Sequence, residues 1–404
     1  MQIPQRFQDL PEYAFPRLRA LLDVHAPGAS PVAMSIGEPR HAPPAFLAEA
    51  LADAAEGWTR YPPNEGTPEL RGAICDWLRR RYGLAEGRTD PDRHVIPLNG
   101  TREGLFNACI ALCPETKNGA RPAVLMPNPF YQCYAAATLA VGAEPVFLPC
   151  GPDTGFLPDL DALPRDLLDR TAIFYLCSPS NPQGAVASDA YLRRLIALAE
   201  THDFRIFADE CYCEIWRDAP PPGALAVAQG MDADPERVVI FHSLSKRSNL
   251  PGLRSGFAAG GPQAITAMKT LRAYGGAPIP GPIQAVSARI WADEAHVDAS
   301  RALYQRKYTI ADEVLGNMPG YRAPEAGFFL WLEVGDGEAA ALKLWRETGV
   351  RALPGAYLSR PTPPALGTGD PGAAFLRVAL VETEARVRAG LIAIRTCLHP
   401  GAGV

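Results

Sequence analysis

The chain has 404 residues, of which 47% are hydrophobic and 21% are charged, and its formal net charge is −5 at pH 7. This is the composition of a folded globular protein long enough for about two domains. The slightly acidic balance, without a dense run of lysine and arginine, argues against a nucleic-acid surface, because binding DNA depends on neutralising phosphates. We therefore expect small-molecule chemistry.

The cysteine and histidine usage indicates neither a disulfide framework nor a metal centre. The nine cysteines stand mostly within apolar segments, which predicts reduced, buried thiols in a cytoplasmic protein. Cys211 and Cys213 form a lone C-x-C, and the seven histidines show no metal-binding spacing, so we expect no metal site. No stretch has the length and apolar character of a signal-peptide core or a membrane span, so we expect no membrane partner.

An N-terminal arm is the first element that the sequence predicts. Residues 6–25 carry apolar side chains near helical spacing after Pro16, and proline suits the first turn of a helix. The arm should therefore present one apolar face. A short apolar run then enters a turn at Gly37, where the missing side chain would let a ligand approach the backbone, although a plain turn explains the glycine equally well.

Two helices are expected next, with a proline-rich loop between them. Composition predicts a helix over 47–58, and Thr67 as N-cap with Pro68 at the first helical position marks the start of a helix that continues to Tyr82. Tyr61 lies in the loop that connects them. It is either a surface aromatic residue or a phenol that hydrogen-bonds a partner.

The following unit is a strand, a glycine turn and a helix. The apolar run 95–98 predicts the strand, Gly100 the turn, and the helix begins at Thr101 and Arg102. A helix N-terminus has free backbone amides and binds phosphate groups readily. An ordinary capped helix would show the same pattern, so this unit by itself leaves both interpretations open.

Strand and helix alternate from there to the middle of the chain. Apolar strands are expected at 124–126, 146–148, 173–176, 206–208 and 238–241. Strands buried on both faces that alternate with helices predict a largely parallel sheet and therefore an α/β fold. Aromatic and polar residues follow several strands at the carboxyl ends, where open α/β sheets bind ligands: they are Tyr131, Asn181, Asp209 and Tyr212.

The strand expected at 238–241 is followed by a cluster of hydroxyl, amine and guanidinium side chains. Ser243, Ser245 and Lys246 follow the strand, and Arg254 stands eight residues after the lysine. An amine can form an imine with a carbonyl cofactor, whereas hydroxyls and a guanidinium suit a phosphate. Together they point to pyridoxal phosphate bound covalently at Lys246. The competing interpretation is a solvated basic loop after a core strand.

The chain changes in character after residue 281. Helix-like stretches and two late apolar strands replace the regular alternation, which predicts a second, smaller α+β domain. The expected division is an arm with part of the small domain in 1–45, a large cofactor-binding domain in 46–281 and a small domain in 282–404. Arg377 lies inside the last apolar strand, where a charge is unfavourable unless it is paired. It either forms a structural ion pair or binds a carboxylate.

Five motifs in the same order resemble the fold-type I aminotransferases, the family of aspartate aminotransferase, over nearly the whole chain. The motifs S-x-S-K with a later arginine, S-x-x-N-P-x-G and D-E-x-Y match residues 243–254, 178–184 and 209–212. Y-x-x-x-x-G with a following L-R matches residues 61–71, and a late strand arginine matches Arg377. The resemblance implies a large domain with a mostly parallel sheet and a smaller α+β domain.

The resemblance also implies roles around the cofactor. Lys246 would hold pyridoxal 5′-phosphate covalently and then shuttle a proton. Asp209 would pair with the protonated ring nitrogen, and Tyr212 and Asn181 would hydrogen-bond the ring oxygen. Tyr131 would stack on the ring, with Phe130 as the weaker alternative. The phosphate would bind backbone amides, hydroxyls, a guanidinium and a phenol, contributed by Gly100, Thr101, Arg102, Ser243, Ser245, Arg254 and Tyr61.

The substrate side and the assembly follow from the same resemblance. Arg377 would grip the α-carboxylate as a bidentate fork, helped by Asn181 and the Gly37 backbone. The partners would be a small amino donor and a 2-oxo acid acceptor. Tyr61 would come from the neighbouring subunit, which implies a homodimer with two shared sites.

Longer loops resemble the proteobacterial succinyldiaminopimelate aminotransferases of lysine and diaminopimelate biosynthesis. The match rests on residues 127–134, 207–216 and 242–257. Such an enzyme converts N-succinyl-LL-2,6-diaminopimelate and 2-oxoglutarate into N-succinyl-2-amino-6-oxopimelate and glutamate. The extra carboxylates of that donor would require a cation besides Arg377. The sequence does not choose among three further arginines, which are Arg17, Arg102 and Arg247.

Other functions fit the same cofactor residues. Another aminotransferase of this branch, with an alanine, aromatic or glutamine-type donor, would share all of them. A pyridoxal-phosphate lyase on this fold would need no 2-oxo acid acceptor. A non-catalytic ligand sensor of this fold usually carries a DNA-binding helical module, and the sequence shows no basic N-terminal domain.

Overall fold

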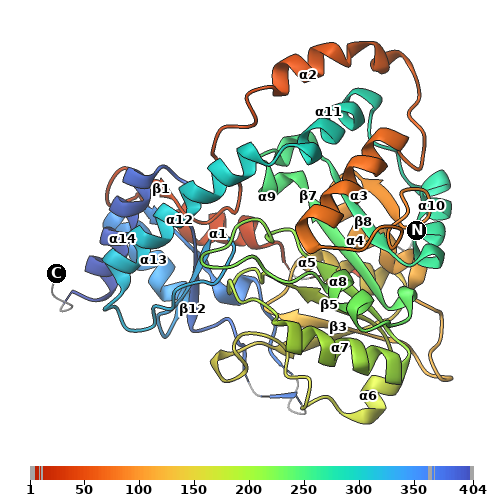
Figure 1. Cartoon of the computed structure of the whole chain (residues 1–404). Helices are drawn as coiled ribbons and strands as arrows, with labels where there is room; N and C mark the ends of the chain where they lie inside the picture. Colours follow the sequence, from red (N-terminus) through yellow and green to blue (C-terminus); the bar gives the residue numbers. More distant parts are fainter. Residues whose placement is uncertain (1–4, 9, 11, 363–365, 368, 401–404) are drawn as a thin grey trace.

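A seven-stranded sheet forms the centre of the larger part of the molecule (Figure 1). The computed structural model describes residues 5–8, 10, 12–362, 366–367 and 369–400. Strand order across the sheet is β2-β8-β7-β6-β5-β3-β4, and β8 alone runs antiparallel to its neighbours. The strands are β2 (Val95–Leu98), β3 (Ala123–Asn128), β4 (Glu144–Pro149), β5 (Thr171–Cys177), β6 (Arg205–Asp209), β7 (Val238–Ser243) and β8 (Gly256–Gly260).

Helices cover both faces of this sheet, because each central strand is apolar on both sides. In β3, Val124 and Met126 pack into one hydrophobic cluster, whereas Ala123 and Leu125 pack into another on the opposite face. Successive side chains of a strand point to opposite faces, so a continuous apolar run needs a layer on each side. One layer contains α4 (Thr101–Leu112), α5 (Gln132–Ala140) and α10 (Pro262–Gly275); the other contains α3 (Pro68–Tyr82), α7 (Asp189–His202), α8 (Ala224–Gly230) and α11 (Gly281–Ala292).

The smaller part contains an antiparallel sheet of three strands in the order β11-β12-β9 and a short parallel pair, β1 with β10. In Figure 1 its helices lie to one side of the large sheet, and α11 continues into α12 from one part to the other. Its elements are β1 (Val32–Ala33), β9 (Phe329–Glu333), β10 (Val350–Arg351), β11 (Leu353–Pro354), β12 (Phe375–Ala379), α1 (Ala14–Leu22), α12 (Ala295–Leu315), α13 (Gly337–Thr348) and α14 (Glu384–Leu398).

The expected fold class is confirmed: the protein has an α/β fold, with a mostly parallel sheet and a smaller C-terminal part. The division of the chain at residues 45 and 281 stays a prediction. Helix α11 bears on it, because Val286 and Ile290 pack in the same hydrophobic cluster as α3 of the large part. The core contacts of α11 therefore favour a boundary at the joint between α11 and α12.

Two local expectations were wrong. The helix expected over 47–58 is shorter, because α2 (Leu47–Asp53) ends early and a 3-10 turn follows. Strand β8 was not predicted, since its sequence GFAAG has no β-branched residue. Glycine is needed there because a side chain would collide: a Cβ at Gly256 would lie 2.5 Å from the carbonyl oxygen of His242. The paired strands β2 and β7 therefore decide the conformation of β8.

Candidate active site

A cavity of about 540 Å³ opens where β5, β6 and β7 end. Cys177, Asp209 and Ser243, the last residues of these strands, line it together. The carboxyl ends of parallel strands meet at one edge of a sheet, which is where open α/β folds bind ligands. The cavity collects almost every residue that the sequence singled out: Gly37, Thr101, Arg102, Tyr131, Asn181, Asp209, Tyr212, Ser243, Ser245, Lys246, Arg254 and Arg377.

Two expected site residues do not line this cavity. Gly100 lies in the turn just before α4, and Tyr61 has a fully exposed side chain, with 102% relative accessibility. The weaker candidate for ring stacking, Phe130, does line the cavity beside Tyr131, but its side chain is buried against Phe147, with ring centroids 4.8 Å apart.

Lys246 lies in the short helix α9 (Leu244–Arg247) directly after β7. Ser243 caps this helix, since its hydroxyl accepts a hydrogen bond of 3.0 Å from the Ser245 amide. The Lys246 amine points into the cavity and donates to the carbonyl oxygen of Gly37. Burial, together with the positive charge of Arg377, lowers the pKa of Lys246 to about 8. Roughly a tenth of this amine is therefore neutral and nucleophilic at about pH 7, far more than for an exposed lysine.

This lowered pKa predicts how fast Lys246 captures an aldehyde. Only the neutral amine attacks, so the rate at which the cofactor-free protein binds pyridoxal phosphate covalently should rise with pH, with a midpoint near 8. Borohydride trapping after a short fixed time, from about pH 6 to about pH 11, measures this rate. The variant Arg377→Met should shift the midpoint upward because it removes a neighbouring positive charge. A wild-type midpoint above about 10, the range of an exposed lysine, would contradict the prediction.

Asp209 presents a carboxylate from the end of β6, and its side chain is only 6% exposed. Burial raises the pKa of this carboxyl, and hydrogen bonds from Cys211 and Tyr134 oppose the rise. The Tyr134 hydroxyl donates to Oδ2 at 2.7 Å. Sequence reasoning missed Tyr134, although it stands three residues after Tyr131 on α5 and so lies on the same helical face.

An anion cradle forms between the start of α4 and the loop after β7. Gly100 has a φ of 82°, and a Cβ there would lie 2.2 Å from Nη2 of Arg254, so only glycine fits. No side chain caps α4, which leaves the first amides of this helix directed at the cavity. Arg254 donates to the Asn99 carbonyl at 3.1 Å, and the Ser243 and Ser245 hydroxyls lie 2.8 Å apart. These donors fit a phosphate group.

Arg377 points from β12 into the same cavity and is 4% exposed. Its guanidinium donates to Asn181 Oδ1 at 3.0 Å and to the Ser35 carbonyl at 2.8 Å. It also lies 4.3 Å from the centre of the Phe329 ring. Burial lowers the pKa of Arg377 to about 10. Among the described residues it has no carboxylate partner, so the structural ion pair considered from the sequence is not formed.

The charge of the cavity is unbalanced. Of the described residues, four cationic side chains line it, but only two carboxylates do, Glu38 and Asp209. Within the described part of the chain, none of the four cations forms an ion pair, and they are Arg102, Lys246, Arg254 and Arg377. A cavity with unpaired cations is suited to ligands with several anionic groups.

Of the three arginines considered for a distal carboxylate, only Arg102 lines the cavity. Its Nε donates to the Tyr131 hydroxyl at 2.5 Å, and its terminal nitrogens make no hydrogen bond to the described residues. Arg17 instead pairs with Glu338 at 3.3 Å and lies over the Tyr357 ring. Neither Arg17 nor Arg247 lines the cavity.

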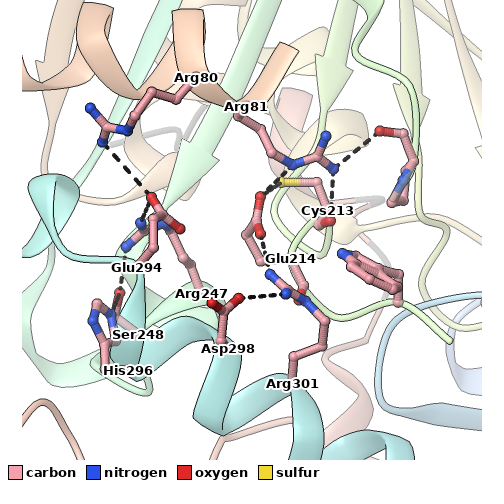
Figure 2. A network of polar contacts seen from close by, with 12 residues as sticks. Arg80, Arg81, Cys213, Glu214, Arg247, Ser248, Glu294, His296, Asp298 and Arg301 are labelled. Atoms are coloured by element: carbon pink, nitrogen blue, oxygen red, sulfur yellow. Dashed lines mark hydrogen bonds and ion pairs between the residues drawn. The ribbon is translucent and has the colours of Figure 1, made fainter. Parts of the chain in front are cut away.

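Arg247, the last residue of α9, is buried and belongs to a network of polar contacts (Figure 2). It donates to Glu294 at 2.6 Å and to the Asp293 carbonyl at 3.2 Å, at the joint between α11 and α12. In the same network Glu214, 3% exposed, accepts from Arg81 at 2.7 Å and from Arg301 at 2.8 Å. The network thus ties α3, α9 and α12 together.

The Glu214 carboxylate should contribute strongly to stability. Glu214→Gln would leave two largely buried guanidinium groups without their shared anion, so we expect the free energy of unfolding to fall by about 3–5 kcal/mol. Urea unfolding measures this loss. The control is Asp298→Asn, which removes the exposed partner of Arg301 and should change the free energy of unfolding by less than about 1 kcal/mol. Equal small effects of both substitutions would contradict the prediction.

A reactive lysine, a buried acid and an anion cradle at the edge of this sheet define the class of proteins with the fold-type I architecture that use pyridoxal 5′-phosphate. The model of the family "aminotransferase class I and II" matches residues 30–394. The chain belongs to this family and is a transaminase that uses pyridoxal 5′-phosphate.

Individual relatives extend over almost the whole chain. An LL-diaminopimelate aminotransferase of Dehalococcoides mccartyi is 30% identical over 399 residues, covering 97% of each chain. The structure of an aminotransferase from Neisseria meningitidis Z2491 has a TM-score of 0.92 and 35% identity, covering 98% of this chain and 100% of the other. Aminotransferase AspB from Helicobacter pylori 26695 has a TM-score of 0.87 and 31% identity, covering 98% and 99%.

The residues that the structure describes also bear on membrane association and metal binding. They contain no helix of the length and apolar character that crossing a membrane requires. They also contain no group of three or more histidine, cysteine, aspartate or glutamate residues placed to hold a metal ion.

Proposed function

We propose that this aminotransferase converts N-succinyl-LL-2,6-diaminopimelate and 2-oxoglutarate into N-succinyl-2-amino-6-oxopimelate and glutamate. The observation that carries the proposal is a set of three guanidinium groups in one cavity that form no ion pair with the described residues, those of Arg102, Arg254 and Arg377. The cofactor phosphate and the substrate α-carboxylate would account for two of them. The third supports a substrate with a distal anion, which both the succinylated donor and 2-oxoglutarate carry.

The residues of the cavity divide the chemical work in this proposal. Pyridoxal phosphate, when bound, supplies the electron sink. Lys246 binds it covalently and later moves the proton at the substrate Cα, as its lowered pKa allows. Asp209 holds the proton on the ring nitrogen, and Tyr212 and Asn181 bind the ring oxygen. Tyr131 covers one face of the ring.

The remaining roles concern the phosphate and the substrate carboxylate. The turn at Gly100, the amides of Thr101 and Arg102 and the side chain of Arg254 hold the phosphate, together with the hydroxyls of Ser243 and Ser245. Arg377 binds the α-carboxylate, with Asn181 and the Gly37 backbone beside it.

We also propose a homodimer in which Tyr61 reaches the phosphate of the neighbouring subunit. Its fully exposed phenol lies outside the cavity of its own chain, which supports a partner across an interface. The nine cysteines are all free thiols, which supports the proposed cytoplasmic location.

The second candidate donor is LL-2,6-diaminopimelate without the succinyl group. Several relatives at about 30% identity carry the name LL-diaminopimelate aminotransferase. Glu38 in the cavity also favours this donor, because its carboxylate could bind the distal ammonium group that succinylation removes.

The test is the visible spectrum of the pure protein while amino donors are added one at a time without a 2-oxo acid. Conversion to the pyridoxamine form by the succinylated donor, far more efficiently than by the free diaminopimelate, alanine, aspartate or phenylalanine, would support the proposal. Preference for free diaminopimelate would select the second candidate, and preference for a common amino acid would reject both. Arg102→Met should lower the efficiency of conversion by the preferred donor but not by alanine, which has no distal carboxylate.

A further inference from the structure

Tyr134 is a buried titratable residue that none of the roles above uses. It lies on α5 and does not line the cavity, and its side chain is 0% exposed. Its hydroxyl donates to Oδ2 of Asp209 at 2.7 Å. The Cys211 amide donates to Oδ1 at a longer 3.4 Å, and the Cys211 side chain also lowers the pKa of this carboxyl. The Tyr134 hydroxyl therefore makes a shorter hydrogen bond to Asp209 than the Cys211 amide does.

A second phenol fixes Tyr134 in place. The rings of Tyr134 and Tyr175 stack with centroids 4.4 Å apart and an angle of 11° between their planes. The Tyr175 hydroxyl donates to the carbonyl oxygen of Leu105 at 2.9 Å, one turn into α4. The stacked pair thus contacts both ends of the cofactor site, the acid at one end and the phosphate-cradling helix at the other.

The hydrogen bond from Tyr134 favours the ionised form of the Asp209 carboxyl. A buried carboxylate is destabilised as an anion, and a neutral donor on one oxygen favours the charged form. Burial and the nearby Asp209 charge raise the pKa of Tyr134 well above its ordinary value, so the phenol keeps its proton and donates. With Oδ2 occupied by Tyr134, Oδ1 is the oxygen left to face a ligand in the cavity.

We propose that Tyr134 is a positioning residue that keeps Asp209 ionised and aims its other oxygen, Oδ1, at the cofactor ring nitrogen. This inference rests on the role proposed for Asp209. It makes Tyr134 part of the machinery that holds the proton on that nitrogen, although it touches neither cofactor nor substrate. Its removal should weaken the interaction at the ring nitrogen without altering the phosphate cradle.

The test compares two buried tyrosines that each lose one hydroxyl, Tyr134→Phe and Tyr175→Phe. The full chain, freed of cofactor, is titrated with pyridoxal phosphate and with its 1-deaza analogue, which lacks the ring nitrogen. The ratio of the two affinities reports the contact between the nitrogen and Asp209. We expect Tyr134→Phe to reduce this ratio about tenfold or more, which is the range for a hydrogen bond to a charged group. Tyr175→Phe should leave the ratio unchanged.

Asp209→Asn, measured in parallel, distinguishes an error in the role proposed for Asp209 from an error in the role proposed for Tyr134. If this variant retains the wild-type ratio, the role proposed for Asp209 is wrong. If Asp209→Asn lowers the affinity ratio while Tyr134→Phe leaves it at the wild-type value, the role of Tyr134 alone is overturned. If the Tyr134→Phe protein fails to fold, Tyr134→Gln is the second variant, because it retains an N–H donor. It should keep part of the preference for pyridoxal phosphate over the 1-deaza analogue. A Gln variant with no preference at all would also contradict the positioning role.

Discussion

Replacing Lys246 by alanine should reduce turnover at least about 10⁴-fold, the upper range for loss of a positioned acid–base group. The residue has two functions in the proposed mechanism, because it binds the cofactor covalently and moves the substrate proton. Pyridoxal phosphate should still bind through the cradle around Arg254, but borohydride should no longer attach it to the protein. Steady-state rates and the mass of the reduced protein measure both effects.

The matched control for this substitution is Lys269→Ala. Lys269 lies on α10, outside the cavity, and donates to the Asp92 carbonyl at 2.6 Å. Its removal should leave turnover and borohydride attachment as they are in the wild type. Full turnover by the Lys246→Ala protein at the wild-type rate would show that the proposed mechanism is wrong.

Replacing Arg377 by methionine should separate substrate binding from stability. In the proposed mechanism the α-carboxylate would lose its buried bidentate partner, which corresponds to about 3–4 kcal/mol and therefore a fall in kcat/KM of about 10²- to 10³-fold. The substitution should not reduce the stability of the folded protein, because Arg377 is a buried charge without a carboxylate partner among the described residues. We expect the free energy of unfolding to stay constant or to rise by up to about 2 kcal/mol.

Two measurements test this separation, steady-state kinetics with the preferred donor and urea unfolding without ligand. Arg377→Lys is the control, since it keeps the charge but loses the planar fork, and it should recover only part of kcat/KM. A destabilised Arg377→Met protein with normal kcat/KM would mean that the arginine is structural.

Much of the site could be predicted because the chemistry of a parallel sheet is concentrated at one edge. Asp209 and Lys246 follow apolar strands directly, so their place at the carboxyl edge depends only on recognising β6 and β7. Thr101 follows a glycine turn and a strand, and the structure brings it to the same cavity. The short-range order of strand, turn and polar residue was sufficient for these positions.

Other features depended on segments that are distant in the sequence. Strand β8 has no strand propensity of its own and forms because β2 and β7 pair with it on both sides. Arg247 stands next to Lys246 in a basic run, yet it points away from the cavity toward Glu294. Adjacent residues on a helix face different directions, and which one meets the cavity depends on the helix's packing.

The sequence by itself determined the α/β class, the strands of the large sheet other than β8 and most of the residue types that line the cavity, because hydrophobic period and motif spacing are local properties. Only the tertiary structure decided which charges lack a partner. Arg102 and Arg377 face the cavity without a carboxylate partner in the described part of the chain, whereas Arg17 meets Glu338 across more than three hundred residues of sequence. Pairing is a property of through-space distance, and the chain's folding, not the order of its residues, sets that distance.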